Sequence, residues 1–267
     1  MKEELFEVFR KKIIPSAFLN RNVIYDLVLP KNMVNDTPYP TIYMNDGQDF
    51  DQLETLNSIR HYYKKGGQAF IFVAIHTNER RLSEYGTSFQ ADYKNRGDKA
   101  TDYMNFVVSE LLPLIRKETA SSSIANDNTF CGFSLGGLSA MDIVWENPHL
   151  FSKVGVFSGS FWWRDKSYEE GYTDDQDRIM HNKIRKSNYK SGLKFWLECG
   201  TADETADRNN NGIIDSIEDT LDIITELKNK GYNQSDIKYV EIDGGEHNFN
   251  TWKHAFPQFL EWVFDSK

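Results

Sequence analysis

Short apolar segments rich in β-forming residues alternate along this chain with longer amphipathic segments, and this alternation most constrains its fold. The apolar segments are residues 23–29, 41–44, 69–75, 129–133, 154–157, 194–197 and 237–242. Several are apolar throughout, as expected for strands that are covered on both faces of a parallel sheet. Strands that alternate with helices are joined by right-handed crossovers. The sequence therefore predicts an α/β fold with a mostly parallel central sheet and helices on both faces.

The segments between the strands carry helical periodicity. Apolar residues recur at spacings of three and four within residues 99–117, 138–145, 219–230 and 251–264. At the start of the chain, residues 6–14 and 23–29 are expected to pair as an antiparallel N-terminal hairpin. No stretch rich in Pro, Gly or Ser divides the 267 residues, so we expect one domain.

One connection, residues 161–192, is unusually long, charged and rich in tyrosine, with a short helical stretch near residues 177–185. Loops of this length are usually functional or mobile. The segment is therefore either a lid over a site or a plain surface insertion.

Composition and charge disfavour two classes of binding partner. The formal net charge of −9 disfavours nucleic acid, and no apolar run approaches the ~20 residues that a membrane span needs. The charged start, residues 1–4, lacks the apolar core of a secretion signal, which favours a cytoplasmic location.

Cys131 and Cys199 each end an apolar strand-like run, so we expect small buried side chains rather than reactive thiols or a disulfide. No pattern indicates an oligomeric state.

Residues 132–136 read Gly-Phe-Ser-Leu-Gly and lie between an expected strand and an expected helix. This G-x-S-x-G context is typical of a nucleophile on a tight strand-to-helix turn. Side chains two residues before and after Ser134 would collide in such a turn, which accounts for Gly132 and Gly136. Ser134 would also stand at a helix N-terminus, where amide dipoles favour negative charge. Together with Gly137, the context predicts Ser134 as a nucleophile rather than part of a structural turn.

A serine hydroxyl needs a base to remove its proton. In folds of this type the partners follow in the order Ser, acid, His. His247 and His254 lie beyond the last expected strand, His247 in a loop and His254 within a helical pattern. His247 is therefore the predicted base, while His76, at the end of an earlier strand, could line the pocket.

The acid should follow the strand at residues 194–197. Asp203 is the first carboxylate there and our prediction, and Glu204 and Asp207 remain alternatives.

The oxyanion site needs two backbone N–H groups. One should belong to Leu135, directly after the nucleophile. The other should come from Gln48, after the sharp turn that Gly47 permits, although an ordinary Asp-Gly turn is an alternative reading of that loop.

Taken in order, residues 43–48, 132–137, 158–163, 199–201 and 245–252 resemble the Putative esterase family of the α/β-hydrolases, which includes enterochelin esterases, feruloyl esterases, S-formylglutathione hydrolase and the mycolyltransferases. The resemblance implies the α/β-hydrolase fold and a serine carboxylic ester hydrolase that works through an acyl-enzyme. Carried over residue by residue, it implies Ser134 as the nucleophile, Asp203 as the acid, His247 as the base and Gln48 as an oxyanion donor. It also implies a small-molecule ester as substrate and no organic cofactor.

Aromatic residues near the nucleophile are candidates for substrate contact. Residues 158–163 look most like the siderophore-esterase branch, where this loop borders the active site. Trp162 and Trp163 could stack on an aromatic acyl group or could be core residues, and Phe133 and Gly47 are further predicted contacts. The acidic residues between 169 and 177 disfavour a trianionic catecholate substrate.

Residues 207–218 match the calcium-loop pattern D-x-[DN]-x-[DN]-G-x₅-E in full. The pattern assigns as ligands the side chains of Asp207, Asn209, Asn211 and Glu218, the carbonyl of Ile213, and Asp215 through water. We expect a structural Ca²⁺ that fixes the loop presenting Asp203, and a solvated Asn/Gly turn is the alternative.

Two other classes of function share these motifs. An acyltransferase would use the same triad with a different acceptor, and a calcium-dependent binding module would keep the loops without catalysis.

Overall fold

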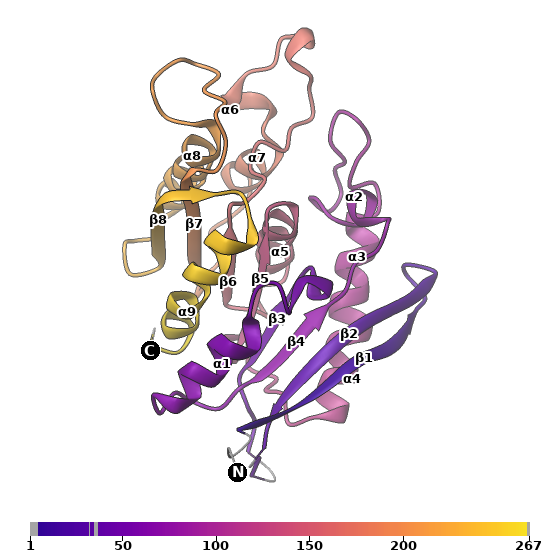
Figure 1. Cartoon of the computed structure of the whole chain (residues 1–267). Coiled ribbons are helices and arrows are strands. Elements are labelled where there is room, and N and C mark those ends of the chain that lie inside the picture. The colour runs from indigo at the N-terminus through magenta and orange to yellow at the C-terminus, as the bar shows by residue number, and fades with distance from the viewer. Residues whose placement is uncertain (1–4, 32, 35–36, 266–267) are drawn as a thin grey trace.

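The structure, a computed structural model, describes residues 5–31, 33–34 and 37–265 (Figure 1). The charged start at residues 1–4, which suggested a cytoplasmic location, lies outside this range. Within it, strands form one eight-stranded sheet in the order β1-β2-β4-β3-β5-β6-β7-β8. Their bounds are β1 Phe6–Ser16, β2 Arg21–Pro30, β3 Thr41–Met44, β4 Ile71–Ile75, β5 Asn128–Phe133, β6 Lys153–Phe157, β7 Lys194–Ala202 and β8 Ile237–Glu246.

Strand directions confirm the predicted mixed sheet. β1 and β2 form an antiparallel hairpin, and β2 joins β4 antiparallel. Every pairing from β4 through β3, β5, β6 and β7 to β8 is parallel. Because carboxyl ends of parallel strands share one edge, the loops after β3, β5, β6, β7 and β8 meet there.

The principal helices are α1 Thr55–Lys64, α2 Arg81–Glu84, α3 Ala100–Phe106, α4 Leu112–Glu118, α5 Leu135–Glu146, α6 Asp174–Asp177, α7 Ile179–Lys186, α8 Asp215–Lys230 and α9 Phe249–Asp265. The expected helix at residues 99–117 is divided into α3 and α4 by a π-helical turn, Val107–Leu111. Pro113, which has no N–H for the helical ladder, lies just beyond that turn. Helix α1 was not expected from the sequence, because its apolar face is short and the helix is rich in polar residues.

Two apolar layers cover the sheet. One contains buried residues of α3, α4, α5, α7 and α8, and the other contains buried residues of α1 and α9. Figure 1 shows α1 and α9 in front of the sheet and α3 and α5 behind it. Both sheet faces are therefore buried, which explains the apolar strands. No helix in the described ranges is long and apolar enough to cross a membrane.

The two cysteines behave as predicted. Cys131 and Cys199 are both free and completely buried. Burial raises the pKa of both thiols, which keeps them neutral and unreactive.

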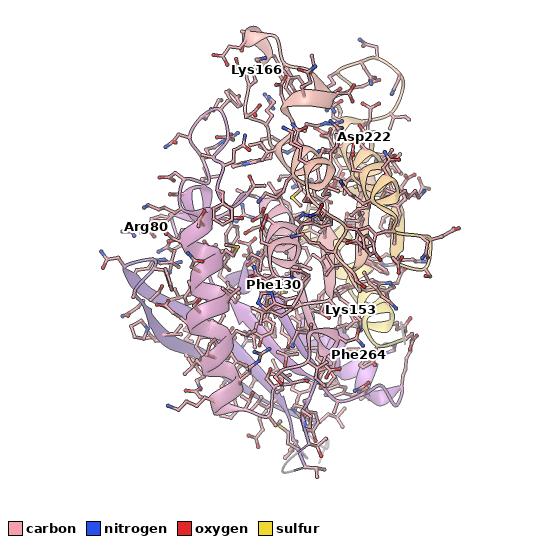
Figure 2. The ribbon with its side chains drawn as sticks, turned by 180° about the vertical axis from the view of Figure 1, so that it is seen from behind. Arg80, Phe130, Lys153, Lys166, Asp222 and Phe264 are labelled. Atoms are coloured by element: carbon pink, nitrogen blue, oxygen red, sulfur yellow. The ribbon has the colours of Figure 1, made fainter. Side chains whose placement is uncertain are left out.

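The long 161–192 connection contains α6 and α7 and is held to the body of the protein by charged contacts. Arg178 is 2% exposed and binds Asp219 and Asp222 of α8 at 2.5 and 2.6 Å. Lys183 binds Asp142 of α5 at 2.5 Å. Figure 2 shows Lys166 near the top of the view, well above Lys153 and Phe264, which lie around the middle of the molecule. The 161–192 connection is thus tied to α5 and α8 by ion pairs.

Candidate active site

Ser134 occupies the tight turn between β5 and α5. Its backbone has φ 53° and ψ −123°, a conformation that residues other than glycine rarely adopt. A Cβ at Gly132 would lie 2.3 Å from the Gly136 carbonyl oxygen, and a Cβ at Gly136 would lie 2.5 Å from Asp46 Oδ2. The predicted collision within the turn is therefore confirmed for Gly132, whereas Gly136 makes room for Asp46 of the loop after β3.

The hydroxyl of Ser134 is partly exposed at the carboxyl edge. Its Oγ lies 3.4 Å from Ser160 Oγ, at the limit of a hydrogen bond. Within the described part of the chain, no hydrogen bond joins it to His247. Catalytic hydrogen bonds are often long in ligand-free enzymes and tighten when substrate binds.

His247 and Asp203 come together from the loops after β8 and β7. His247 Nδ1 lies 3.6 Å from Asp203 Oδ1, with the imidazole 41% exposed and the carboxylate buried. His254 lies on the exposed side of α9. The geometry therefore pairs Asp203 with His247.

The alternative acids point elsewhere. Glu204 is partly buried beside Ser216, and burial raises its pKa. Asp207 accepts hydrogen bonds from the amides of Asn211 and Gly212 at 3.1 and 2.8 Å within its own loop. Among the three carboxylates, only Asp203 is placed against the imidazole.

His76 has a separate partner. Its Nε2 lies 3.3 Å from Asp26 Oδ2 on β2. Burial alone would raise the pKa of Asp26, but the nearby His76 and the hydrogen bonds from the Lys11 amide and Arg10 lower it to about 2. His76 thus lies beside a partly buried polar cluster around Asp26 on the hairpin side of the sheet.

The predicted oxyanion loop follows β3 directly. A Cβ at Gly47 would lie 2.5 Å from the Ala74 carbonyl carbon, so this turn requires glycine. The short helix η1, Gly47–Asp49, makes its first backbone bonds from the amides of Asp49 and Phe50. The Gln48 N–H comes before the first of these bonds, so the helix itself does not use it. The Leu135 N–H has the same position at the start of α5.

A clamp that the sequence analysis missed fixes this loop. Asp46 has φ 59°, and its two carboxylate oxygens accept Arg81 Nε and Nη2, each at 2.8 Å. Asn45 Nδ2 donates to the Gly136 carbonyl at 2.8 Å, which ties the loop to α5. The Asn-Asp pair before Gly47 was the available sequence signal, but nothing local pointed to Arg81.

Ser158 and Trp252 support the Asp203–His247 pair and were likewise not singled out. Ser158 Oγ lies 3.0 Å from Asp203 Oδ1, and Trp252 Nε1 lies 2.9 Å from Ser158 Oγ. The rings of Trp252 and His247 meet edge to face with centroids 5.1 Å apart. Both residues lie inside segments that carried the family resemblance, which was the only sequence signal.

A second buried carboxyl group lies near Asp203. Glu198 of β7 is 1% exposed, and neither of its oxygens has a hydrogen-bond partner among the described residues. Burial, together with the negative charge of Asp203, raises the pKa of Glu198 to about 8. Glu198 is therefore mostly protonated at pH 7.

The structure corrects two of the predicted substrate contacts. Trp163 is fully buried, and Phe133, which is 3% exposed, stacks on Phe157 at 4.8 Å. Both are core residues because their rings are enclosed by protein on all sides. Trp162 is partly exposed, with the Arg96 guanidinium 5.3 Å from its ring centre. Trp162 is thus the aromatic residue of this pair that a ligand can reach.

The 207–218 loop, orange in Figure 1, lies next to the 161–192 connection. Glu218 accepts hydrogen bonds from the side-chain amides of Asn209 and Asn211, at 2.8 and 2.6 Å. The side-chain nitrogens of Asn209 and Asn211 thus face Glu218, whereas their oxygens accept the backbone amides of Asn211 and Ile213 within the loop. Asp215 instead accepts the Arg208 amide at 2.9 Å. Across the described residues, no three His, Cys, Asp or Glu side chains are clustered to hold a metal, so a cation here would depend on asparagine oxygens.

Comparison with known proteins places the chain in a family. The family model described as "Putative esterase" matches residues 16–263. The uncharacterized protein YbbA of Bacillus subtilis (strain 168) is 22% identical over 247 residues, covering 90% of this chain and 92% of that protein. The iron(III) enterobactin esterase of Escherichia coli (strain K12) is 26% identical over 160 residues, covering 60% of this chain and 35% of that protein.

Solved structures share the fold. A ferulic acid esterase superposes with a TM-score of 0.73 at 17% identity, covering 98% of both chains. The enterochelin esterase of Shigella flexneri superposes with a TM-score of 0.73 at 19% identity, covering 100% of this chain and 59% of that one. This chain therefore belongs to the Putative esterase family and is a carboxylic ester hydrolase with the α/β-hydrolase fold.

Proposed function

We propose that the protein hydrolyses small carboxylic esters through a Ser134–His247–Asp203 triad and an acyl-enzyme. The observation that carries the proposal is the strained backbone of Ser134, at φ 53°. Strain of this kind persists where it serves a mechanism, here by exposing a hydroxyl at a helix N-terminus. The 3.6 Å approach of His247 to Asp203 supports the assignment of base and acid.

In this mechanism His247 removes the Ser134 proton as Oγ attacks the ester carbonyl carbon. The amides of Leu135 and Gln48 stabilise the oxyanion of the tetrahedral intermediate. His247 then protonates the leaving alcohol, and the acyl group remains on Ser134. A water molecule, deprotonated by His247, attacks this acyl-enzyme and releases the acid. Asp203 orients the imidazole and stabilises its charged form throughout.

The test is hydrolysis of short p-nitrophenyl esters by the wild type and by Ser134→Ala. We expect kcat to fall by roughly 10⁴-fold or more in the variant. Ser139→Ala, a buried serine one helical turn further along α5, is the matched control. A fluorophosphonate should label the wild type stoichiometrically and leave Ser134→Ala unlabelled. Equal activity in both proteins would disprove the proposal.

An acyltransferase would use the same residues. Product analysis with added alcohols separates the two activities, because a hydrolase yields mainly free acid and a transferase yields a new ester. Labelling of Ser134 without turnover of any ester would favour the non-catalytic binding module instead.

We further propose that the 207–218 loop binds a structural Ca²⁺. Asp207, Asn209, Asn211 and Glu218 would supply side-chain oxygens and Ile213 its carbonyl, with Asp215 reached through water as the motif assigns. The ion would add positive charge that holds Glu218 and Asp207 together across the loop. The loop begins four residues after Asp203, so its order bears on the position of the triad acid.

Thermal unfolding in CaCl₂, MgCl₂ and EDTA tests this proposal. We expect calcium to raise the Tm of the wild type and not that of Glu218→Gln. Glu241→Gln, an exposed glutamate on β8, should respond like the wild type. An identical Tm and identical activity in calcium and EDTA would exclude a structural calcium site.

A further inference from the structure

We propose that Ser158 and Trp252 form a hydrogen-bond relay that positions the triad acid, so that both are positioning residues for ester hydrolysis. This inference rests on the proposed triad. It begins with the two contacts at Ser158 Oγ: Trp252 Nε1 at 2.9 Å and Asp203 Oδ1 at 3.0 Å.

The chemistry of the groups gives the relay one direction. An indole N–H is only a donor, so Ser158 Oγ must accept from Trp252. The hydroxyl proton of Ser158 is then directed to Asp203 Oδ1, because a carboxylate only accepts. This is the same oxygen that faces His247 Nδ1. The relay therefore orients the carboxylate oxygen that the imidazole needs.

Burial makes the relay rigid. Ser158 is 2% exposed and Trp252 is 6% exposed, so water does not compete for these hydrogen bonds. The indole also packs on Phe133 at 5.3 Å and on the His247 ring at 5.1 Å. One side chain, Trp252, thus contacts the base directly and reaches the acid through a single hydroxyl.

The backbone of Ser158 supports a role for its hydroxyl. Its φ of 47° lies in the left-handed region, where glycine is the unstrained choice. Its amide donates to the Glu198 carbonyl at 2.8 Å, so the backbone position itself is fixed by the sheet. A glycine would adopt this backbone conformation with less strain. The presence of a serine is therefore explained by the hydrogen bonds of its hydroxyl group.

The test compares Ser158→Gly and Trp252→Phe with the wild type on a p-nitrophenyl ester. Ser158→Gly removes the hydroxyl and relieves the strained backbone, and Trp252→Phe keeps an aromatic ring and removes the N–H. We expect kcat to fall about 10-fold to 100-fold in Ser158→Gly, because hydrogen bonds to charged groups are worth that much. A smaller fall is expected for Trp252→Phe, and KM and Tm should change little in either variant.

A double variant distinguishes a relay from two separate effects. Because Ser158→Gly already breaks the relay, adding Trp252→Phe should cost little more, so the two losses should not add. Trp262→Phe is the matched control on the same helix, since Trp262 packs on Trp196 and Phe259 away from the triad. It should keep the wild-type kcat.

Three results would overturn the inference: kcat within twofold of the wild type in folded Ser158→Gly, fully additive losses in the double variant, or a change in KM alone. His247→Ala separates this failure from failure of the triad. Loss of activity in His247→Ala with unchanged Ser158→Gly would reject only the relay. Unchanged activity in His247→Ala would reject the triad itself.

Discussion

The two halves of the proposed active site are held in place by different means. On the nucleophile side, backbone contacts decide the geometry. At Gly132 and at Gly47, backbone atoms of Gly136 and Ala74 come so close that an added Cβ would lie within 2.6 Å of them. On the acid and base side, side chains decide it, through Ser158, Trp252 and Asp203. His247 is 41% exposed there, whereas Leu135 and Gly47 are buried.

This difference has a physical consequence. A backbone position fixed by close packing is rigid, and most substitutions there damage the fold. A side chain fixed by hydrogen bonds can be removed while the fold survives, at the expense of rate. We therefore expect substitutions of the closely packed glycines on the nucleophile side to lose stability, and variants on the acid and base side to lose activity first.

On the acid and base side, the largest effect should come from the proposed acid, Asp203. Asp203→Asn should lower kcat by roughly 10³–10⁴-fold, because a neutral amide no longer stabilises the imidazolium. Glu204→Gln, one residue away and turned towards Ser216, should keep most of the activity. Steady-state ester hydrolysis checks both variants. A larger loss in Glu204→Gln would mean that the side-chain contacts on this half of the site have been assigned to the wrong carboxylate.

Glycine substitutions sharpen the comparison through stability. Gly132→Ala should destabilise the protein by roughly 3 kcal/mol or more, because its Cβ would overlap the Gly136 carbonyl. Gly244→Ala, near His247, has φ 67° and nothing within 4 Å of its Cβ, so only about 1 kcal/mol of backbone strain is expected. Urea unfolding measures both. Similar losses would show that the two halves are packed alike.

Glu198 provides a pH-dependent test with a smaller effect. Below about pH 4.5, its ordinary pKa, the group is protonated in folded and unfolded protein alike. Between there and its folded pKa of about 8, the unfolded chain releases a proton that the folded protein retains, so stability falls as pH rises.

Glu198→Gln removes this proton linkage. The variant should gain stability relative to the wild type as pH rises, on the order of a few kcal/mol by pH 8.5. Unfolding in urea across pH 5 to 9 measures the difference. Parallel stability curves for the two proteins would show that Glu198 titrates normally.

The sequence by itself determined the features that depend on local pattern. Alternating apolar and amphipathic segments specify the parallel sheet, because periodicity is set within each element. Gly132 specifies the strained turn, because the collision that it avoids is with Gly136, only four residues further along the chain. The order of Ser134, Asp203 and His247 follows from their positions after strands β5, β7 and β8.

Only the tertiary structure decided which side chains meet across the carboxyl edge. It paired Asp203 rather than Glu204 with His247, placed Trp163 in the core, and brought Arg81 to Asp46. Ser158 contacts Asp203 across 45 residues of sequence and Trp252 across 94. No local periodicity encodes contacts between residues so far apart, because they arise only when the parallel strands bring their ends together.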